Sequence, residues 1–380
     1  MFAADVFGNV YNTSSKVSAT AYYPGDNATW TEDKLQNYGG NLIWRVEGAV
    51  EIVDMGSCGD SVTWTLDAEN TLTIAGTGAM TSYNSYRMVP WDQYRATVTK
   101  VVVEEGVTSI GGYAFYNMPN LTEVILPSTL TTIEQYAFRG CSALESIVIP
   151  DSVTVLGTTE TGATGFESDG VFAGCNKLEK VVIGNGVTTI GSYAFYKCVV
   201  LTDVQLGNSV EKIGLWAFYD CTRLENIELP ESLTMLGDEA FYNCRSLKSI
   251  KIPDSVTNLG YHVFQKCLKL ESAEIGNGVT NIPEWTFANC NALTNVKLGN
   301  HVETIDRYAF LGCFALPSIE LPETLKSIGE YAFECRALTT VRYKGTKAQW
   351  ATVEIHKNWK QGAYDLKTVI CSDGEITIQS

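Results

Sequence analysis

Residues 193–215 read YAFYKCVVLTDVQLGNSVEKIGL, and residues 216–238 read WAFYDCTRLENIELPESLTMLGD, which is the same pattern repeated after 23 residues. A phenylalanine marks each copy, and eight of the nine intervals between successive markers are 23 residues long. A fixed period of this size is typical of stacked repeat folds. The ninth interval spans 34 residues and predicts one insertion. The marker phenylalanines are Phe115, Phe138, Phe172, Phe195, Phe218, Phe241, Phe264, Phe287, Phe310 and Phe333.

Nine of the ten repeats place apolar residues at the same distances from the phenylalanine, and the last repeat has lost one residue. Leucine follows six residues later, further apolar residues follow at nine and eleven, and proline or glycine comes next. A strand has to end there, because proline cannot donate to a ladder and glycine favours a turn. Each repeat is therefore expected to form one coil with a strand, a turn, a short extended piece and a single helical turn that bears Phe and Cys. Stacking would bury the apolar side of each coil against its neighbours.

The cysteines follow the same period. Eight of them lie three residues after a marker phenylalanine, and Cys335 lies two residues after one. Stacked copies would lie ~4.8 Å apart with parallel side chains that do not point at each other, so we expect a buried, reduced ladder. Cys58 and Cys371 lie near opposite ends of the stack and are not expected to pair. No histidine interleaves and no tight C-x-x-C pair exists, so the sequence predicts no metal or other cofactor.

Four regions follow from where the repeat holds and where it fails. A stack of repeats ends in an exposed apolar cross-section, so atypical terminal units must cover it. Trp350 and Trp359 are the expected lids on the last coil. The predicted regions are a β-rich N-terminal segment at 1–57, an N-terminal cap at 58–98, the solenoid at 99–343 with its insertion near 158–168, and a C-terminal cap at 344–380.

The recurring LPxxLxxIgxxAFxxC pattern resembles the cell-surface leucine-rich repeats of the BspA type, found in oral and gut bacteria and in treponemes. The resemblance covers roughly 99–343, and the stretch CGDSVTWTL…GTGAM resembles a lead-in common to such proteins. It implies a right-handed leucine-rich-repeat solenoid, a β-dominated α/β fold with a parallel sheet on its concave face. It also implies an extracellular protein, since family members are extracellular and several are implicated in adhesion to host matrix proteins or other bacteria.

One column of sheet residues, ten positions after each phenylalanine, changes character along the chain. From Glu228 onward its charge alternates in sign, which predicts a self-compensating structural ladder, with a polar ligand site as the alternative. Its first four members are apolar and would face solvent, which usually marks a contact site. The alternative is that the N-terminal segment or the insertion covers them. These four residues are Val102, Ile125, Val148 and Val182.

A second column, two residues before each phenylalanine, is mostly aromatic and includes Trp216 and Trp285. Aromatic rows can stack sugars or grip proteins, but at repeat spacing they more often cover the outer edge of the coils. Gly170 and Glu239 interrupt this column, which argues against one continuous binding strip. Phe166 lies within the insertion, where it could anchor either the loop or a partner.

Charge and motif content exclude several function classes. A net charge of −16 disfavours nucleic acid, and no apolar run is long enough to insert in a membrane. The three histidines share no repeat position and no catalytic motif is present, so the chain is not expected to be an enzyme. The leading hypothesis is a secreted or cell-surface bacterial adhesion protein that binds a host matrix or bacterial surface protein. The alternatives are glycan binding through the aromatic column and a purely structural spacer.

Overall fold

The computed structural model describes residues 18–23, 41–46, 51–157 and 170–378. The chain divides into two compact units, Met1–Val53 and Asp54–Ser380. The first unit contains two parallel paired strands, β1 (Ser18–Tyr23) and β2 (Asn41–Val46). Both strands lie in stretches where the sequence alternates apolar and polar residues.

The second unit begins with a cap on the first coil. Strands β4 (Val62–Asp67) and β5 (Thr71–Gly76) form an antiparallel hairpin, and β5 continues in parallel into the solenoid. The indole of Trp91 is fully buried, stacks on Phe115 at 5.9 Å and donates to the carbonyl of Ala114 at 2.8 Å. It therefore closes one end of the core. The remaining cap elements are β3 (Ile52–Ser57), β6 (Gly78–Ala79), η1 (Tyr86–Met88) and η2 (Asp92–Tyr94).

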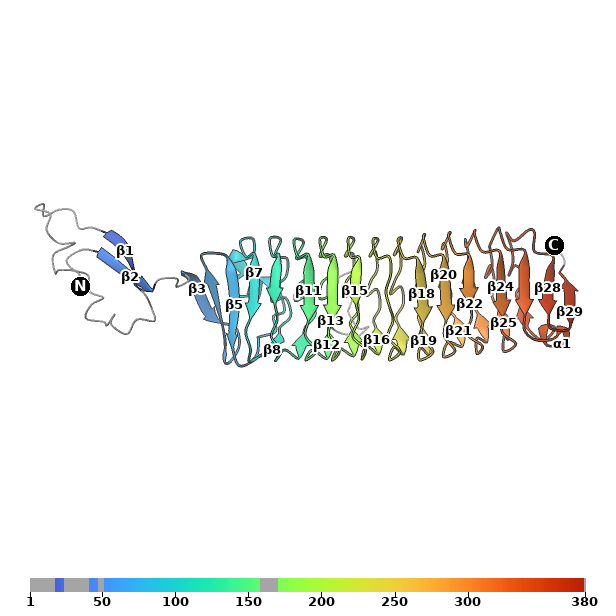
Figure 1. Ribbon diagram of the computed structural model, residues 1–380, viewed down its shortest axis with the longest axis horizontal. Helices are drawn as coiled ribbons and strands as arrows, with labels where there is room; N and C mark the ends of the chain where they lie inside the picture. The colour runs from blue at the N-terminus through green and yellow to red at the C-terminus, as the bar shows by residue number, and fades with distance from the viewer. Residues whose placement is uncertain (1–17, 24–40, 47–50, 158–169, 379–380) are drawn as a thin grey trace, which may run out of the picture. The chain divides into compact units, whose positions relative to one another are not determined.

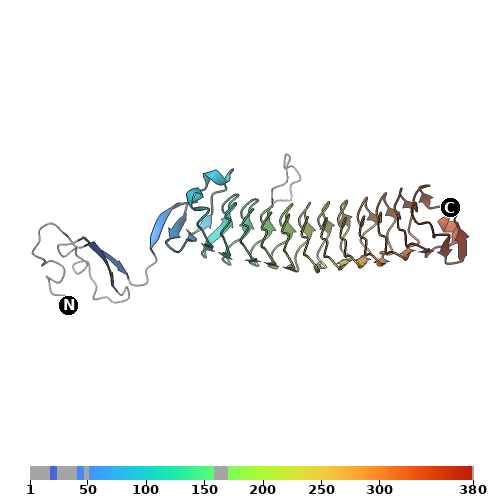
Figure 2. The ribbon, with the colours of Figure 1, turned by 90° about the horizontal axis from the view of Figure 1, so that it is seen from above.

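The repeats stack as successive coils, as Figures 1 and 2 show for the second unit. Most coils contribute one strand of three or four residues to a parallel sheet face; the coil that contains Phe218 has no such strand, although its Ile227 is still buried. These first strands are β7 (Lys100–Val103), β9 (Glu123–Ile125), β11 (Ser146–Ile149), β13 (Lys180–Ile183), β15 (Asp203–Gln205), β18 (Ser249–Ile252), β20 (Ser272–Ile275), β22 (Asn295–Lys297), β24 (Ser318–Leu321), β26 (Thr340–Tyr343) and β28 (Thr368–Cys371).

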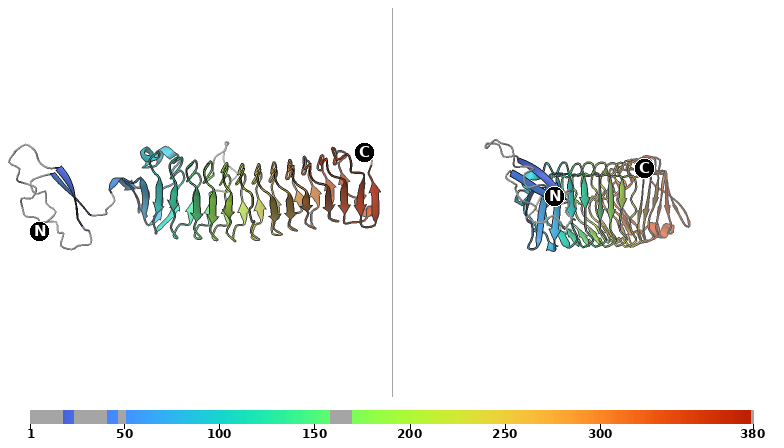
Figure 3. Two further views of the ribbon diagram at one scale, coloured as in Figure 1. Left: turned by 45° about the horizontal axis from the view of Figure 1, so that its top comes forward. Right: turned by 60° about the vertical axis from the view of Figure 1, so that its left-hand side comes forward.

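A second strand, usually of two residues, forms another set of parallel ladders along the edge of the row of coils that is lowermost in Figure 1, and Figure 3 shows the same row from two further directions. These ladders keep the same one-coil register, since Ile190 pairs with Ile213 and Ile213 with Leu236. The second strands are β8 (Val107–Ile110), β10 (Thr132–Ile133), β12 (Val155–Leu156), β14 (Thr189–Ile190), β16 (Lys212–Ile213), β17 (Met235–Leu236), β19 (Asn258–Leu259), β21 (Asn281–Ile282), β23 (Thr304–Ile305), β25 (Ser327–Ile328) and β27 (Glu354–Ile355).

The core is a spine of phenylalanine and cysteine. All ten marker phenylalanines are fully buried, and the ring centroids of neighbours lie 5.1–5.6 Å apart. Each ladder thiol reaches the carbonyl oxygen of a phenylalanine in the preceding coil, as Cys198 does with Phe172 at 3.2 Å. All eleven cysteines lie in the described part of the chain, and all are free and buried. The predicted reduced ladder is therefore confirmed, and Cys58 and Cys371 do not pair.

The segment around each phenylalanine is not the expected helical turn. In most coils the residues two before and two after the phenylalanine adopt positive φ, and Gly170 and Cys335 are the exceptions; around Phe195 these residues are Tyr193 at 58° and Lys197 at 58°. The N–H of Phe195 donates to Ala217 in the next coil at 2.8 Å, and the N–H groups of both flanking residues also donate to that coil. Because these two residues are left-handed, every second N–H group of the segment points along the stacking axis toward the next coil. A right-handed helical turn would not direct them there. The backbone polar groups are satisfied between coils for this reason.

The C-terminal cap covers the other end of the spine. Trp359 packs edge-on against Phe333 at 5.9 Å, and Trp350 contacts Trp359 at 6.3 Å, as expected for two lids. Trp350 ends α1 (Lys347–Trp350), and the last strand, β29 (Gly374–Thr377), pairs antiparallel with β28. Within the described residues, no helix is long and apolar enough to span a membrane.

Candidate binding site

The four predicted apolar residues lie side by side on the sheet face, and we call them the apolar stripe: Val102, Ile125, Val148 and Val182. Val102 on β7 pairs with Ile125 on β9, and Val148 on β11 pairs with Val182 on β13. Ile125 is 44% exposed and Val148 is 61% exposed, while Val102 and Val182 are half-buried. Together the four residues form an apolar surface that crosses four coils.

Charged pairs run beside the apolar stripe, two residues earlier along the strands, and the second pair reaches from β13 to the next strand, β15. Lys100 Nζ lies 3.0 Å from a carboxylate oxygen of Glu123, and Lys180 Nζ lies 2.9 Å from Asp203. The hydrogen bond from Lys180 holds the pKa of the Asp203 carboxyl below its usual range. An apolar centre with a charged, solvent-exposed rim is the usual anatomy of a protein–protein interface.

The N-terminal segment and the insertion are the two segments predicted as possible covers of the apolar stripe, and neither can be placed against it. Phe166 and residues 158–169 lie outside the described residues, as does most of the N-terminal segment. The hypothesis of a covered stripe and the hypothesis for Phe166 therefore both stay predictions.

Beyond the apolar stripe, the same column becomes the predicted charge ladder. Glu274 pairs in register with Lys251 on one side and Lys297 on the other. Its carboxylate lies 2.5 Å from Lys297 Nζ, whereas Lys251 reaches sideways to Glu231 at 3.3 Å. The Glu274–Lys297 pair therefore joins two members of the column, whereas Lys251 and Glu320 bond to residues outside it, Glu231 and Lys344.

Replacing Glu274 with lysine should lower the melting temperature slightly, by about one or two degrees, since exposed ion pairs contribute little. The change would place three lysines in register on adjacent strands and remove the contact with Lys297. The drop should shrink at high salt because screening weakens repulsion between exposed charges. Thermal denaturation followed by circular dichroism measures both effects. Glu274→Gln is the control, and equal melting temperatures for the two variants would contradict the charge ladder.

The aromatic column packs mainly against itself. Trp285 has His262 stacked on one side at 5.8 Å and Tyr308 on the other at 4.3 Å, so both ring faces are covered. Trp216 has Tyr193 against it at 4.9 Å and Tyr219 at 5.4 Å. Both tryptophans are half-buried. Sugar stacking needs an open ring face, so this geometry favours packing over glycan binding at these two positions.

A second aromatic row, one residue after the phenylalanine, was not predicted from the sequence. Tyr196 stacks on Tyr219 at 5.1 Å, and Tyr219 stacks on Tyr242 at 4.7 Å. Burial and the nearby Asp220 raise the pKa of Tyr219. Counting every repeat position, and not only the strand residues and the aromatic column, would have revealed this row, its interruption at Arg139 and Ala173, and its end after Tyr242.

Two histidines in the described part of the chain bond to neighbouring polar groups. His262 Nδ1 lies 2.7 Å from the side-chain oxygen of Gln265, and His301 Nδ1 lies 3.0 Å from the carbonyl of Asn277. Among the residues that the structure describes, no three His, Cys, Asp or Glu side chains are grouped to hold a metal ion. What the surface offers is contact area, both apolar and charged.

Comparison with known proteins places the repeats in one family. A family model described as the BspA type leucine-rich repeat region matches residues 93–160, 168–271 and 261–358. No curated protein matches the sequence.

Several solved structures are similar to this chain. A leucine-rich repeat protein from Eubacterium ventriosum is 24% identical over 85% of this chain and 99% of its own, with a TM-score of 0.46. One from Bacteroides ovatus is 26% identical over 82% of this chain and 93% of its own, with a TM-score of 0.45. The T. pallidum leucine-rich repeat protein is 22% identical over 69% of this chain and 91% of its own, with a TM-score of 0.38.

Proposed function

The chain belongs to the BspA-type leucine-rich repeat family, and from that premise we propose that it is a secreted or surface-displayed bacterial protein that binds a protein partner through the apolar stripe. The observation that carries this proposal is the exposure of Ile125 and Val148 on a face where later residues of the same column are polar or charged. Exposed contiguous apolar surface with a polar rim is characteristic of a contact site. The partner class is a host matrix protein or a bacterial surface protein.

A protein partner fits this surface better than a small ligand does. The stripe runs along adjacent strands without a described cavity, and its rim carries fixed ion pairs such as Lys180 with Asp203. A flat apolar centre requires a partner with its own extended apolar patch. The stacked coils hold the stripe on a rigid sheet, so little ordering is needed when a partner binds.

Changing Val148 to aspartate should weaken partner binding at least about tenfold, because the complex would bury an unpaired carboxylate among apolar groups. Biolayer interferometry against a panel of extracellular-matrix proteins and intact bacterial cells provides the measurement. Gln205→Asp is the matched control, since Gln205 is the next polar residue of the same column and pairs with Val182. Equal binding of the two variants would refute the proposal.

Two outcomes separate the alternatives. Glycan-array binding that survives Val148→Asp would favour a carbohydrate-binding protein. Absence of binding to both the protein panel and the glycan array would favour a structural spacer.

A further inference from the structure

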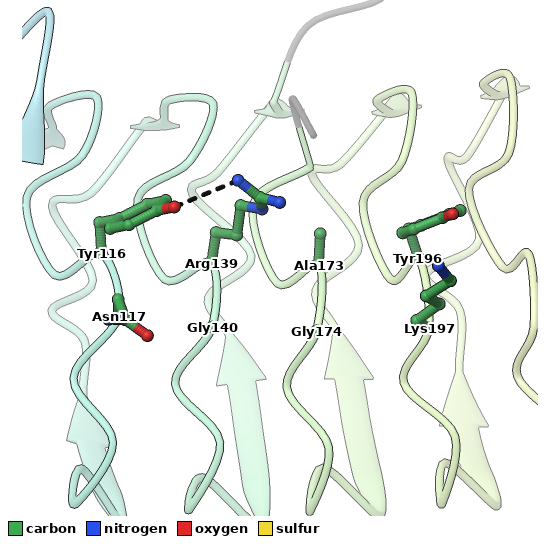
Figure 4. Close-up of a pocket in the computed structure, with 8 residues that line it drawn as sticks. All are labelled: Tyr116, Asn117, Arg139, Gly140, Ala173, Gly174, Tyr196 and Lys197. Carbon is green, nitrogen blue, oxygen red and sulfur yellow. Dashed lines mark hydrogen bonds between the residues drawn. The ribbon is translucent and has the colours of Figure 1, made fainter. Parts of the chain in front are cut away.

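A pocket of about 260 Å³ opens beside the phenylalanine turns, across four consecutive coils (Figure 4). It is separate from the apolar stripe, because its lining residues follow the phenylalanines by one or two positions, whereas the stripe lies on the sheet strands. The residues that the argument uses are Tyr116, Arg139, Ala173, Gly174, Tyr196 and Lys197.

The pocket lies between Tyr116 and Tyr196, where the two intervening coils carry no tyrosine. Where the tyrosine row would continue, the chain has Arg139 and then Ala173. The next position is glycine in both coils, Gly140 and Gly174, with φ of 74° and 73°. In six other coils this position carries Asn, Lys or Asp at φ of 53–63°, so the backbone does not require glycine there. A Cβ added at Gly174 would meet nothing within 4 Å, which leaves the space above it open.

Two cationic side chains flank this space. The Arg139 guanidinium donates to the Tyr116 hydroxyl at 3.2 Å and lies 5.6 Å from that ring centroid. Figure 4 shows it directed over the gap above Ala173. Across the described ranges, no carboxylate forms an ion pair with Arg139. On the far side, Lys197 Nζ lies 4.8 Å from the Tyr196 ring centroid. This concentration of positive charge stands out in a chain of net charge −16.

The floor of the pocket is closed to a ligand's hydrogen bonds. The N–H of Gly140 donates to the carbonyl of Ala173, and the N–H of Gly174 donates to the carbonyl of Tyr196, both at 2.8 Å. A ligand would therefore be bound by the side chains of the lining. They supply a guanidinium, an ammonium, two phenols and the amide of Asn117. One methyl group, from Ala173, is the only aliphatic side chain in the lining.

We propose that this pocket binds one carboxylated sugar unit, such as a hexuronic acid residue of an acidic glycan. A guanidinium matches a carboxylate in two-point geometry, and it is here held in place by Tyr116. The phenols, the ammonium and the amide match ring hydroxyls. The volume lies just below the common range of about 300–1,000 Å³ for ligand pockets, which suits a single polar ring and exceeds what a bare oxyanion needs.

The test uses free glucuronic acid as the probe, with glucose and inorganic phosphate as comparison compounds, on the full chain by ligand-observed saturation-transfer NMR and titration calorimetry. Glucuronic acid should bind, and glucose and phosphate should each bind at least about tenfold more weakly. Arg139→Gln should reduce the affinity about tenfold or more, because it removes the charge but keeps a hydrogen-bonding side chain. Gly174→Asn should abolish binding by filling the space.

Gly312→Asn is the matched control, since Gly312 occupies the same repeat position at φ of 74° outside the pocket lining. It should bind glucuronic acid as the parent chain does. Circular dichroism checks that all three variants keep the fold. Asparagine already stands at this repeat position in Asn117, Asn243 and Asn289, and at position 312 an added Cβ would come within 3.0 Å only of the Asn289 side-chain oxygen, which has to move aside. Equal affinity for glucose, equal affinity for phosphate, or undiminished binding by both Arg139→Gln and Gly174→Asn would overturn the proposal, as would no binding of glucuronic acid at all.

Discussion

Replacing Phe218 with alanine is expected to lower the free energy of unfolding by about 3–5 kcal/mol, the usual range for removing a buried aromatic ring from a core. Phe218 is fully buried, and its ring lies 5.2 Å from those of both Phe195 and Phe241. Backbone hydrogen bonds to the preceding coil and to the following coil hold the coil of Phe218 in register. The cavity therefore cannot collapse by moving one coil alone. Urea denaturation followed by circular dichroism measures the loss.

The position of this change should also alter the cooperativity of unfolding. In a solenoid each repeat contacts only its neighbours, so a weak central coil uncouples the two halves. The urea transition of Phe218→Ala should therefore broaden or split. Phe314→Ala is the control, because Phe314 is 39% exposed and its loss should cost less than about 1 kcal/mol. A central variant no less stable than this control would contradict the stacked-spine account.

The 23-residue period was enough to predict the stacked coils, the buried phenylalanine spine and the cysteine ladder. A residue type locked to the period has the same environment in every copy, so Phe195 and Cys198 could be assigned to the core without coordinates. The exposed face could be predicted for the same reason, because strand residues alternate between faces. Ile125 and Val148 are exposed as expected.

The backbone of the phenylalanine turn could not be predicted in the same way. Tyrosine and tryptophan rarely adopt positive φ, so Tyr193 and Trp216 gave no local signal of a left-handed conformation. That conformation is imposed by the stack, because it directs N–H groups to the next coil and satisfies them there. The prediction of a helical turn was wrong because the backbone of this segment is determined by hydrogen bonds between coils and not by contacts within one coil.

The pocket was missed because it depends on what two adjacent coils lack. Glycine at Gly140 and again at Gly174 is unremarkable as a single residue, since glycine is the default choice for positive φ. The signal is that both glycines follow a position without tyrosine, in two coils that stack directly on each other between the coils of Tyr116 and Tyr196. Whether neighbouring groups such as Arg139 reach into the gap is a matter of side-chain conformation, which the period does not determine.

The folded protein should unfold cooperatively in mild alkali, near pH 10, because its thiols hold their protons far more tightly than those of the unfolded chain. Burial raises the pKa of Cys141 and of Cys198 from the ordinary 9.0 to about 12. Burial raises the pKa of six further ladder thiols in the same direction: Cys175, Cys221, Cys244, Cys267, Cys290 and Cys313.

Because these folded-state pKa values are raised, the stability that the buried thiols contribute is complete below pH 9 and is lost as the pH rises from there toward 12. At about pH 10 a thiol with an ordinary pKa of 9.0 in the unfolded chain and about 12 in the folded protein, as for Cys141 and Cys198, costs about 1.4 kcal/mol. The six further thiols are shifted in the same direction and add to this loss, which acts against a free energy of unfolding of about 5–15 kcal/mol for an ordinary domain. Tyr83, whose pKa burial raises to about 12, adds to the loss only at higher pH.

Circular dichroism and iodoacetamide labelling across this pH range should report one event, since a thiolate can form only where the spine has opened. Urea denaturation at several pH values gives the slope of stability against pH. Cys221→Ala is the control that separates thiols from tyrosines: it is less stable at every pH, but its slope should be smaller by about 1.4 kcal/mol per pH unit. Labelling of the ladder near pH 9 with the circular dichroism signal intact would mean that the thiols are reached without unfolding, and the buried spine would then be wrong.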